Sequence, residues 1–306
     1  MVRYLLRRVL GTLIVIWGVF TIIFLVVRVI PGDPAAVLLG THTTAEMVAE
    51  QRAKMGLDRP LAVQYVLFLR QAVAGDWGHS YHEGRPAFGM VLERMRPTVE
   101  LALASIALTI ALSFILGTLA ARWVQSPVDR AVGVLSLIGQ AVPNFWLGLV
   151  LILVFARNLN WLPSFGRGTP WHLVLPTITL SVQLIGVMTR LIRAGVLETA
   201  GQDYVRTARA KGVAESQVMT RHVYRNMLIP VITMLGLQLG ALLGGVVVIE
   251  IVFAWPGLGR LIVTAINNRD YPVVQAAVTF TAVIFVVLNL LVDLTYGYLD
   301  PRIRYA

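Results

Sequence analysis

Six long stretches without a charged residue constrain this chain more than any other feature of its sequence. They span 9–27, 101–121, 131–156, 173–189, 226–249 and 271–292, with lengths from 17 to 26 residues. A helix needs about 20 apolar residues to cross about 30 Å of hydrocarbon. A lipid-exposed segment must also satisfy its own backbone hydrogen bonds, which a helix does. We therefore predict an all-α polytopic membrane protein with six transmembrane helices.

The composition agrees with a chain dissolved mainly in lipid. Of its 306 residues, 57% are apolar and 14% charged, and the mean hydropathy is +0.74. A water-soluble domain of this length could not bury so much apolar side chain. The chain contains no cysteine, which excludes a disulfide framework, a thiolate nucleophile and a cysteine zinc site.

The net charge of +10 raises the alternative of nucleic-acid binding, but the distribution of the charges favours a membrane orientation. Fourteen Arg and Lys residues fall on the side of the N-terminus, against four in the two short loops opposite. The positive-inside rule then predicts that both termini are cytoplasmic. We expect a multi-pass membrane protein that contacts lipid and no nucleic acid.

The first span could instead be a cleaved signal peptide. Its 19 apolar residues exceed a signal core of about 7 to 15 residues, and residues 30–34 offer no small-x-small cleavage site. We interpret this span as an uncleaved anchor.

The predicted organisation has four parts. Residues 1–30 form the cytoplasmic N-terminus and first span, 31–97 a small extracytoplasmic domain, 98–299 the helical core, and 300–306 a cytoplasmic tail. Within the small domain we expect helices at 44–55 and 61–73 and a turn at Gly75–Gly78. His79 and His82 have a spacing that could serve a metal, but turn residues surround them and no carboxylate pair completes a ligand set, so solvated surface is the preferred interpretation.

The cytoplasmic segment 193–226 is the most informative part of the sequence. We predict a short helix at about 202–211, a stop at Gly212, and a second helix. Small side chains at Thr207, Ala208 and Ala210 would admit another surface, and Tyr204 and Val205 could be buried in it. The alternative is a solvated basic loop that only sets topology. The residues assigned to this coupling loop are Asp203, Tyr204, Val205, Arg206, Thr207, Ala208, Arg209, Ala210, Lys211, Gly212, Arg221, His222 and Asn226.

This loop resembles the "EAA" loop of ABC importer permeases, in the form found in the dipeptide/oligopeptide/nickel branch. Further segments along nearly the whole chain are similar to the same branch. They are residues 31–34, 56–60, 75–78, 143–148 and 253–259. The long segment after the first span and the ending at 300–302 resemble the first permease of the pair that such systems use. One departure from many permease families is Tyr224-Arg225, where those families place Leu-Pro.

The resemblance implies a type I ABC importer permease fold, a location in a bacterial or archaeal inner membrane, and a set of partners. These are a paralogous permease in a heterodimer, one or two ABC ATPase subunits, and an extracytoplasmic solute-binding protein. ATP and Mg would sit on the ATPases, whose closure would drive alternating access through the loop helix. The sequence is consistent with ATP binding on the partner subunits, because neither Lys54 nor Lys211 follows a Gly-x-x-x-x-Gly motif that could bind phosphate. We therefore expect no cofactor, metal site or catalytic residue in this chain.

Polar and small residues within the spans are candidates for the pathway or for a seam between helices. Gly236, Gly240 and Gly244 recur every four positions and would allow close contact with another helix, either of the second permease or of the same chain. Acids at membrane depth are functional candidates, so Glu250 could face the pathway, whereas Asp293 could pair with an Arg of the tail. The pathway and seam candidates are Gln140, Pro143, Asn144, Gln183, Gly236, Gly240, Gly244 and Glu250.

Two other function classes remain open at this point. A self-contained channel or ion-coupled carrier would need no ATPase, but such proteins carry ionisable clusters at mid-membrane that are missing here. A membrane hydrolase would need a His deep in a span, and none of the five lies there. The solute, whether a dipeptide, an oligopeptide, a nickel complex, haem or another small molecule, is not encoded in any feature of the sequence.

Overall fold

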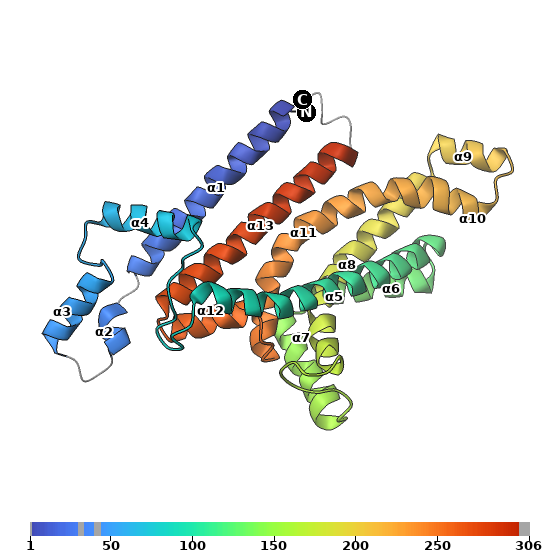
Figure 1. Cartoon of the computed structure of the whole chain (residues 1–306). Helices are drawn as coiled ribbons and strands as arrows, with labels where there is room; N and C mark the ends of the chain where they lie inside the picture. The colour runs from blue at the N-terminus through green and yellow to red at the C-terminus, as the bar shows by residue number, and fades with distance from the viewer. Residues whose placement is uncertain (1, 30–33, 40–43, 300–306) are drawn as a thin grey trace. The chain divides into compact units, whose positions relative to one another are not determined.

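The computed structural model describes residues 2–29, 34–39 and 44–299, and the regular elements in these residues are all helices (Figure 1). Motif residues 31–33 and the tail 300–306 lie outside it. The α-helices are α1 (Val2–Val29), α2 (Pro34–Leu39), α3 (Ala45–Lys54), α4 (Leu61–Val73), α5 (Ala87–Arg122), α6 (Pro127–Ala141), α7 (Asn144–Leu151), α8 (Trp171–Ala200), α9 (Asp203–Ala210), α10 (Glu215–Gln217), α11 (Arg225–Val252), α12 (Leu258–Asn267) and α13 (Tyr271–Leu299). Two π-helical segments, η1 (Ile152–Asn158) and η2 (Val218–Tyr224), continue α7 and α10.

Five of the six predicted spans are single helices. Helices α1, α5, α8 and α13 are long and apolar enough to cross a membrane. Helix α11 has 28 residues and contains the whole predicted fifth span. Pro176 lies in the second turn of α8 and does not break it.

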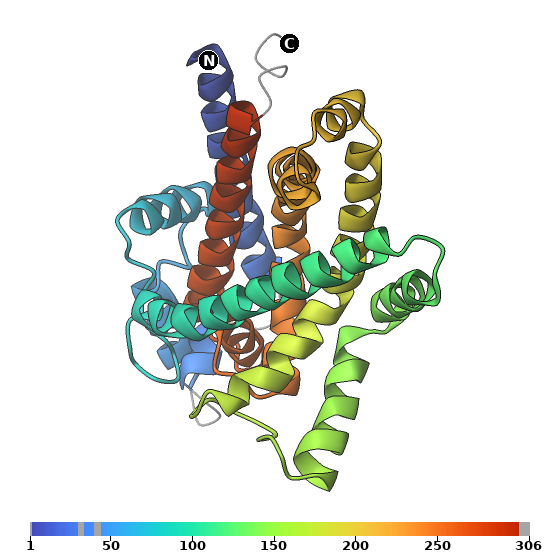
Figure 2. The ribbon, with the colours of Figure 1, turned by 90° about the vertical axis from the view of Figure 1, so that its right-hand side faces the viewer.

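The third predicted span is not one straight helix. Helices α6 and α7 are separated at Val142 and Pro143 and meet at a bend of 103° (Figure 2). Proline forces the residue before it out of the helical region, and Val142 is accordingly extended, with φ −77° and ψ 124°. The segment 131–156 therefore consists of two helices joined at a sharp bend, and not of the single helix that the sequence predicts.

The chain divides into two compact units that do not follow the sequence order. Unit 1 combines the residues up to Thr98 with Pro256–Leu290, and unit 2 consists of Val99–Trp255 with the residues after Leu290. The predicted extracytoplasmic segment 31–97 therefore forms one body with α1, α12 and most of α13, rather than a domain of its own.

In unit 1, the small helices form as the sequence predicts. Thr44 caps α3 by accepting a hydrogen bond from the Met47 backbone. Helix α4 lies against α1 through an aromatic cluster in which Phe24 and Phe68 have ring centroids 5.6 Å apart and Trp77 stacks on Phe20. The predicted turn after α4 is confirmed, because Gly75 and Gly78 both have positive φ and the Asp76 carboxylate accepts from the Gly78 N–H.

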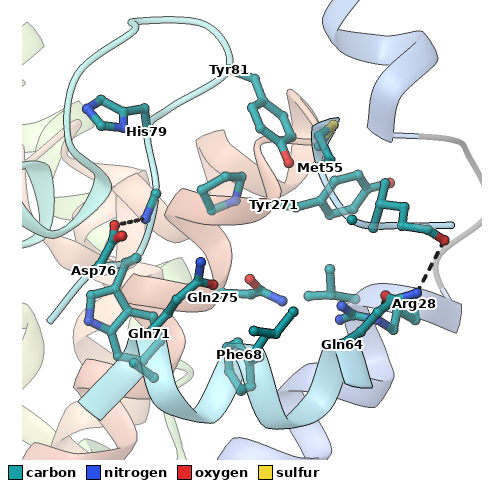
Figure 3. A pocket seen from close by; sticks show the side chains of 18 of the residues that line it. Arg28, Met55, Gln64, Phe68, Gln71, Asp76, His79, Tyr81, Tyr271 and Gln275 are labelled. Carbon is teal, nitrogen blue, oxygen red and sulfur yellow. Dashed lines mark hydrogen bonds between the residues drawn. The ribbon is translucent and has the colours of Figure 1, made fainter. Parts of the chain in front are cut away.

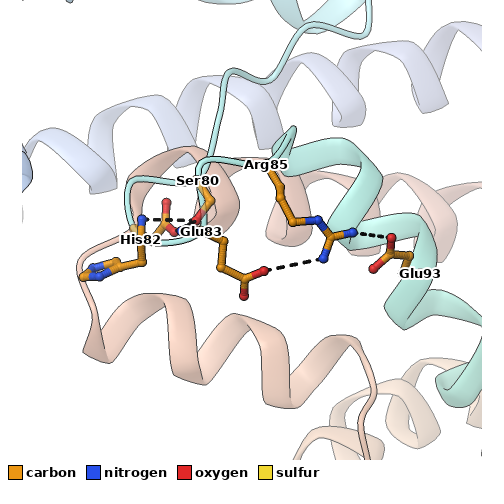
Figure 4. Close-up of polar contacts among 6 residues, drawn as sticks. Ser80, His82, Glu83, Arg85 and Glu93 are labelled. Carbon is orange, nitrogen blue, oxygen red and sulfur yellow. Dashed lines mark hydrogen bonds and ion pairs between the residues drawn. The ribbon is translucent and has the colours of Figure 1, made fainter.

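A buried carboxylate attaches the loop after this turn to the start of α13. Figure 4 shows Ser80, His82 and Glu83 of this loop. Asp270 is 4% exposed and accepts hydrogen bonds from the Ser80 hydroxyl at 2.5 Å and the Tyr81 N–H at 3.1 Å. Ser80 in turn accepts from the backbone N–H of His82 and Glu83. Nearby, the Arg85 guanidinium lies between the carboxylates of Glu83 and Glu93.

In unit 2, α8 lies in the centre and packs against α6, α7 and α11. Gly186 permits the closest of these approaches, since an added Cβ would lie 2.4 Å from the Ser136 carbonyl oxygen of α6. Gly148 of α7 similarly faces Phe253 and Thr179. The apolar core at this end of the unit includes Trp255 and Phe253, each 1% exposed.

Loss of the Asp270 carboxylate is predicted to loosen unit 1. Because hydrogen bonds to a charged group contribute about 1.5–3 kcal/mol, Asp270→Asn should lower the free energy of unfolding by about 2 kcal/mol, measured by denaturant titration in detergent. Asp76→Asn is the matched control, since Asp76 is exposed and makes one such bond. Equal loss in both variants would contradict the role of Asp270.

Candidate functional site

The predicted coupling loop folds as a helix, a glycine stop and a second helix, which confirms the expected order of elements. Helix α9 is preceded by Gln202 in an extended conformation and has Asp203 in its first turn, where an acid is favourable. The helix ends at Ala210, and Gly212 then adopts a φ of +78° that L side chains rarely accept. Figure 1 shows α9 where α8 ends and α10 leads into α11.

The inner face of α9 is buried in its own chain. Val205 is 0% exposed and Ala208 8% exposed. Both belong to an apolar cluster that we call the loop cluster, which also contains buried side chains of α8, η2 and α11. These are Met188, Ile192, Val196, Val218, Val223 and Met227. Val205 is therefore not available for burial in a partner, contrary to the sequence-based expectation, and it instead attaches the loop to the helices.

The outer face of α9 is open to solvent. Its exposed residues are Asp203, Tyr204, Arg206, Thr207, Arg209 and Ala210. The Tyr204 hydroxyl accepts a hydrogen bond from Asn226 Nδ2 at 3.0 Å, and the same amide donates to the His222 carbonyl at 2.7 Å. The predicted loop residues Tyr204, His222 and Asn226 are thus joined, so the ring of Tyr204 is held in place although it is 44% exposed. Arg221 and Lys211 are exposed beside them.

An ion pair closes the turn around Gly212. Arg209 donates from Nε and Nη2 to the two carboxylate oxygens of Glu215, at 3.0 and 2.8 Å. It also reaches the Ala200 carbonyl at 3.3 Å. The hydrogen bonds from Arg209 hold the pKa of the Glu215 carboxyl below its usual range. The pair therefore stabilises the turn at neutral pH and is lost as the pH falls through that pKa, and its contribution is at most about 1 kcal/mol because both side chains are exposed.

A second feature, which we call the polar face, lies on α6, α7 and α8. It consists of Gln140, Asn144, Gln183 and Arg190. Asn144 Nδ2 donates to Gln183 Oε1 at 3.5 Å, and Arg190 Nη2 donates to Gln140 Oε1 at 2.6 Å. Gln183 and Arg190 are exposed and lie two turns apart on one face of α8. Three of the pathway candidates are therefore brought together, and Arg190 joins them.

The other pathway and seam candidates have different surroundings. Pro143 is exposed at the bend between α6 and α7, and Gly244 is exposed with open space where a Cβ would lie. Gly236 is buried within the chain, and the surroundings of Gly240 lie outside the described part. Glu250 is 0% exposed, so it does not line an open face as the sequence suggested. The side chain of Asp293 is outside the described part.

Two ion pairs that the sequence did not identify lie in unit 2, one joining α6 to α8 and the other joining the loop before α8 to α5. Arg193 of α8 binds the Asp129 carboxylate through Nε and Nη2 at 2.6 and 2.7 Å, and Asp129 is 8% exposed. Arg167 binds Glu100 through the same two nitrogens at 3.0 and 2.5 Å. In each pair, the predicted topology places the two residues on the same side of the membrane. This shared position is the signal from which both ion pairs could have been predicted.

The two histidines after the Gly75–Gly78 turn have separate contacts. His82 Nε2 lies 2.7 Å from the Asn268 carbonyl oxygen, and His79 is in a β-bridge with Pro86. Within the described residues, no group of three potential metal ligands comes together.

The chain resembles known proteins along its whole length. Residues 113–305 match the family model described as the inner membrane component of binding-protein-dependent transport systems, and residues 1–113 match the N-terminal region of such a component. The glutathione transport system permease proteins GsiC of Escherichia coli (strain K12) and Salmonella typhi are each 40% identical over 305 residues, covering 100% of both chains. A solved structure described as an amino acid ABC transporter with histidines shares the fold, with a TM-score of 0.52 at 15% identity over 70% of this chain and 94% of that one.

Shortening Val205 is predicted to free α9 from the loop cluster. Val205→Ala removes buried methyl groups at a cost of about 2 kcal/mol, so amide hydrogen exchange over 203–210 should rise at least tenfold. Thr207→Ala, on the outer face two residues away, should leave exchange within about twofold. The reverse order of effects would show that the outer face holds the helix.

Proposed function

We propose that this chain, which belongs to the family of inner membrane components of binding-protein-dependent transport systems, is one of two paralogous permeases that together enclose the pathway of a peptide importer. Family membership makes it a permease subunit rather than an enzyme, acting with a solute-binding protein and an ATPase. The alternative of a self-contained channel or carrier is therefore not retained. The pairing with a paralogue, the substrate and the membrane orientation belong to the proposal.

The observation that carries the proposal is the two-sided character of α9. Its apolar residues are buried in the loop cluster, while a polar face with a fixed tyrosine is exposed. An eight-residue helix is too short to be stable alone, so its position depends on α8 and α11. A partner that binds the outer face can therefore move both helices. We assign the outer face to the groove of an ATPase subunit, with ATP and Mg held there and not in this chain.

The orientation of the chain in the membrane is part of the proposal. The coupling loop carries Arg206, Arg209, Lys211, Arg221 and Arg225 within twenty residues. Such a concentration favours the cytoplasmic side, where the ATPase would also be. Both termini are then cytoplasmic, and 31–97 is extracytoplasmic.

The polar face supplies a wall for the pathway. Its amides can exchange hydrogen bonds with a peptide, and the Arg190 guanidinium can pair with a carboxylate. Relatives at 40% identity are named for transport of glutathione, which is itself a short peptide. We propose short peptides or similar solutes as the substrate, with a binding protein supplying most of the selectivity.

Replacing Gly212 by valine is predicted to uncouple ATP hydrolysis from uptake. A bulky side chain there projects into the open space where the ATPase would approach. Gly75→Val is a matched control, because Gly75 also follows a helix, has a φ of +77° against +78°, and has open space at the Cβ position. Both variants bear the same backbone strain of about 1–2 kcal/mol. Proteoliposomes of the complete importer should lose ATP-dependent uptake with Gly212→Val and keep most of it with Gly75→Val; equal uptake would contradict the docking role.

Arg190→Gln is predicted to weaken transport of anionic peptides. A charge-assisted hydrogen bond contributes about 1.5–3 kcal/mol, so kcat/KM for uptake of a peptide with a free carboxylate should fall at least tenfold. Arg130→Gln makes the same charge change at an exposed position of α6 and should have less than a twofold effect. Unchanged uptake by the Arg190 variant would remove the polar face from the pathway.

A further inference from the structure

A cavity of about 660 Å³ lies within unit 1, bounded by the end of α1, by α4, by the loop before α5 and by the start of α13 (Figure 3). Its size falls within the range of about 300–1,000 Å³ that small-molecule sites occupy. Figure 3 shows Phe68 and Gln71 of α4 on one side, with Tyr81 of the loop on the other. All of the residues that line it belong to unit 1, whereas the polar face belongs to unit 2.

Arg28 provides positive charge at the edge of this cavity. Its Nε donates to Gln64 Oε1 at 3.1 Å, its Nη1 donates to the Phe24 carbonyl at 3.2 Å, and its guanidinium lies 3.5 Å above the Phe24 ring. Gln64 is itself fixed by donating to the carbonyls of Leu57 and Arg59. A guanidinium has five N–H donors, and none of the carboxylates in the described part of the chain forms an ion pair with it. Arg28 is thus oriented by neutral groups and retains donors for an anion.

Tyr271 also lines this cavity. Its side chain is 4% exposed, and its hydroxyl has no hydrogen-bond partner among the described residues. A buried hydroxyl without a partner is unfavourable, and a ligand that forms a hydrogen bond with it would remove this cost. Tyr81 packs edge-on against Tyr271, with ring centroids 6.5 Å apart. Burial, and to a smaller extent the Asp270 carboxylate, raises the pKa of Tyr81, so its hydroxyl stays protonated and able to donate.

The remaining lining suits a ligand with amide groups and an apolar part. Gln71 and Gln275 line the cavity, and their side-chain amides make no hydrogen bond to another described residue. Their amides both donate and accept, as a peptide bond requires. Phe68 and Trp77 supply apolar surface. The acid of the lining, Asp76, accepts from the Gly78 N–H and makes a turn.

We propose that this cavity is a binding site for a short peptide, with the peptide carboxylate on Arg28 and the buried hydroxyl of Tyr271 as a second anchor. The proposal rests on the proposed function for the substrate class and for the outer position of the cavity. It adds a site on the permease itself, in a different unit from the polar face, at which a peptide binds without the solute-binding protein.

The test is calorimetric titration of trialanine into the full chain, assembled with its paralogue and ATPases in phosphatidylcholine nanodiscs without binding protein or ATP. We expect saturable binding that weakens at least tenfold with Arg28→Gln and with trialanine amide, and several-fold with Tyr271→Phe. Arg70→Gln, an equal charge change at an exposed position of α4, should leave affinity unchanged. Tyr271→Phe preserves the packing of the ring, so its effect does not depend on whether the Arg28 variant folds.

Two results would overturn the site. One is absence of binding, or equal affinity in all variants and for the amide. The other is an Arg28-dependent retention of phosphatidylglycerol from mixed-lipid nanodiscs without any binding of trialanine, which would assign the cavity to a lipid headgroup. Uptake of trialanine by the complete importer separates the two proposals. If the importer takes up trialanine but the cavity does not bind it, the proposed site is wrong and the proposed substrate class stands. If the importer does not take up trialanine, the proposed substrate class is wrong.

Discussion

The attachment of α9 to its own chain by Val205 and Ala208 is the interaction on which the functional arrangement depends. The helix is short and polar on its outer side, so it has no stability apart from the loop cluster. The burial of Val205 and Ala208 determines which side of α9 faces outward. The Tyr204–Asn226 hydrogen bond and the Arg209–Glu215 ion pair then hold the two ends of the helix in place. The loop is therefore a rigid projection of α8 and η2 and not a flexible tether.

Helix α8 connects this projection to the polar face. The same helix carries Ile192 and Val196 in the loop cluster and Gln183 and Arg190 on the polar face. The close approach at Gly186 and the Asp129–Arg193 ion pair hold α6 against α8. A displacement of α9 is thus transmitted to the polar groups by packed helices within one unit. This gives a physical route by which a partner at the loop can alter the proposed pathway.

Features that depend on local sequence could be predicted, and features that depend on contacts between distant residues could not. Hydropathy located the spans, and the helix at 44–55, the Gly75–Gly78 turn and the Gly212 stop were evident from the residue types. The sharp bend before Asn144 was underestimated, because a proline only indicates an interruption and packing determines its angle. The inward face of Val205 was missed since an isolated amphipathic octapeptide does not reveal whether its apolar side meets its own chain or a partner. Asp270 and Ser80 are 190 residues apart, and nothing local in either segment indicates that they meet.

The most direct measurement of the central claim is site-specific cross-linking from α9 in the complete importer. The chain has no cysteine, so Thr207→Cys and Ala208→Cys can each carry a single maleimide photo-cross-linker. The arrangement predicts that the probe at the exposed Thr207 position cross-links to an ATPase subunit and that ATP changes the yield. The probe at the buried Ala208 position should label poorly and cross-link within the chain. Cross-links to the ATPase from Ala208 but not from Thr207 would contradict the assignment of the two faces.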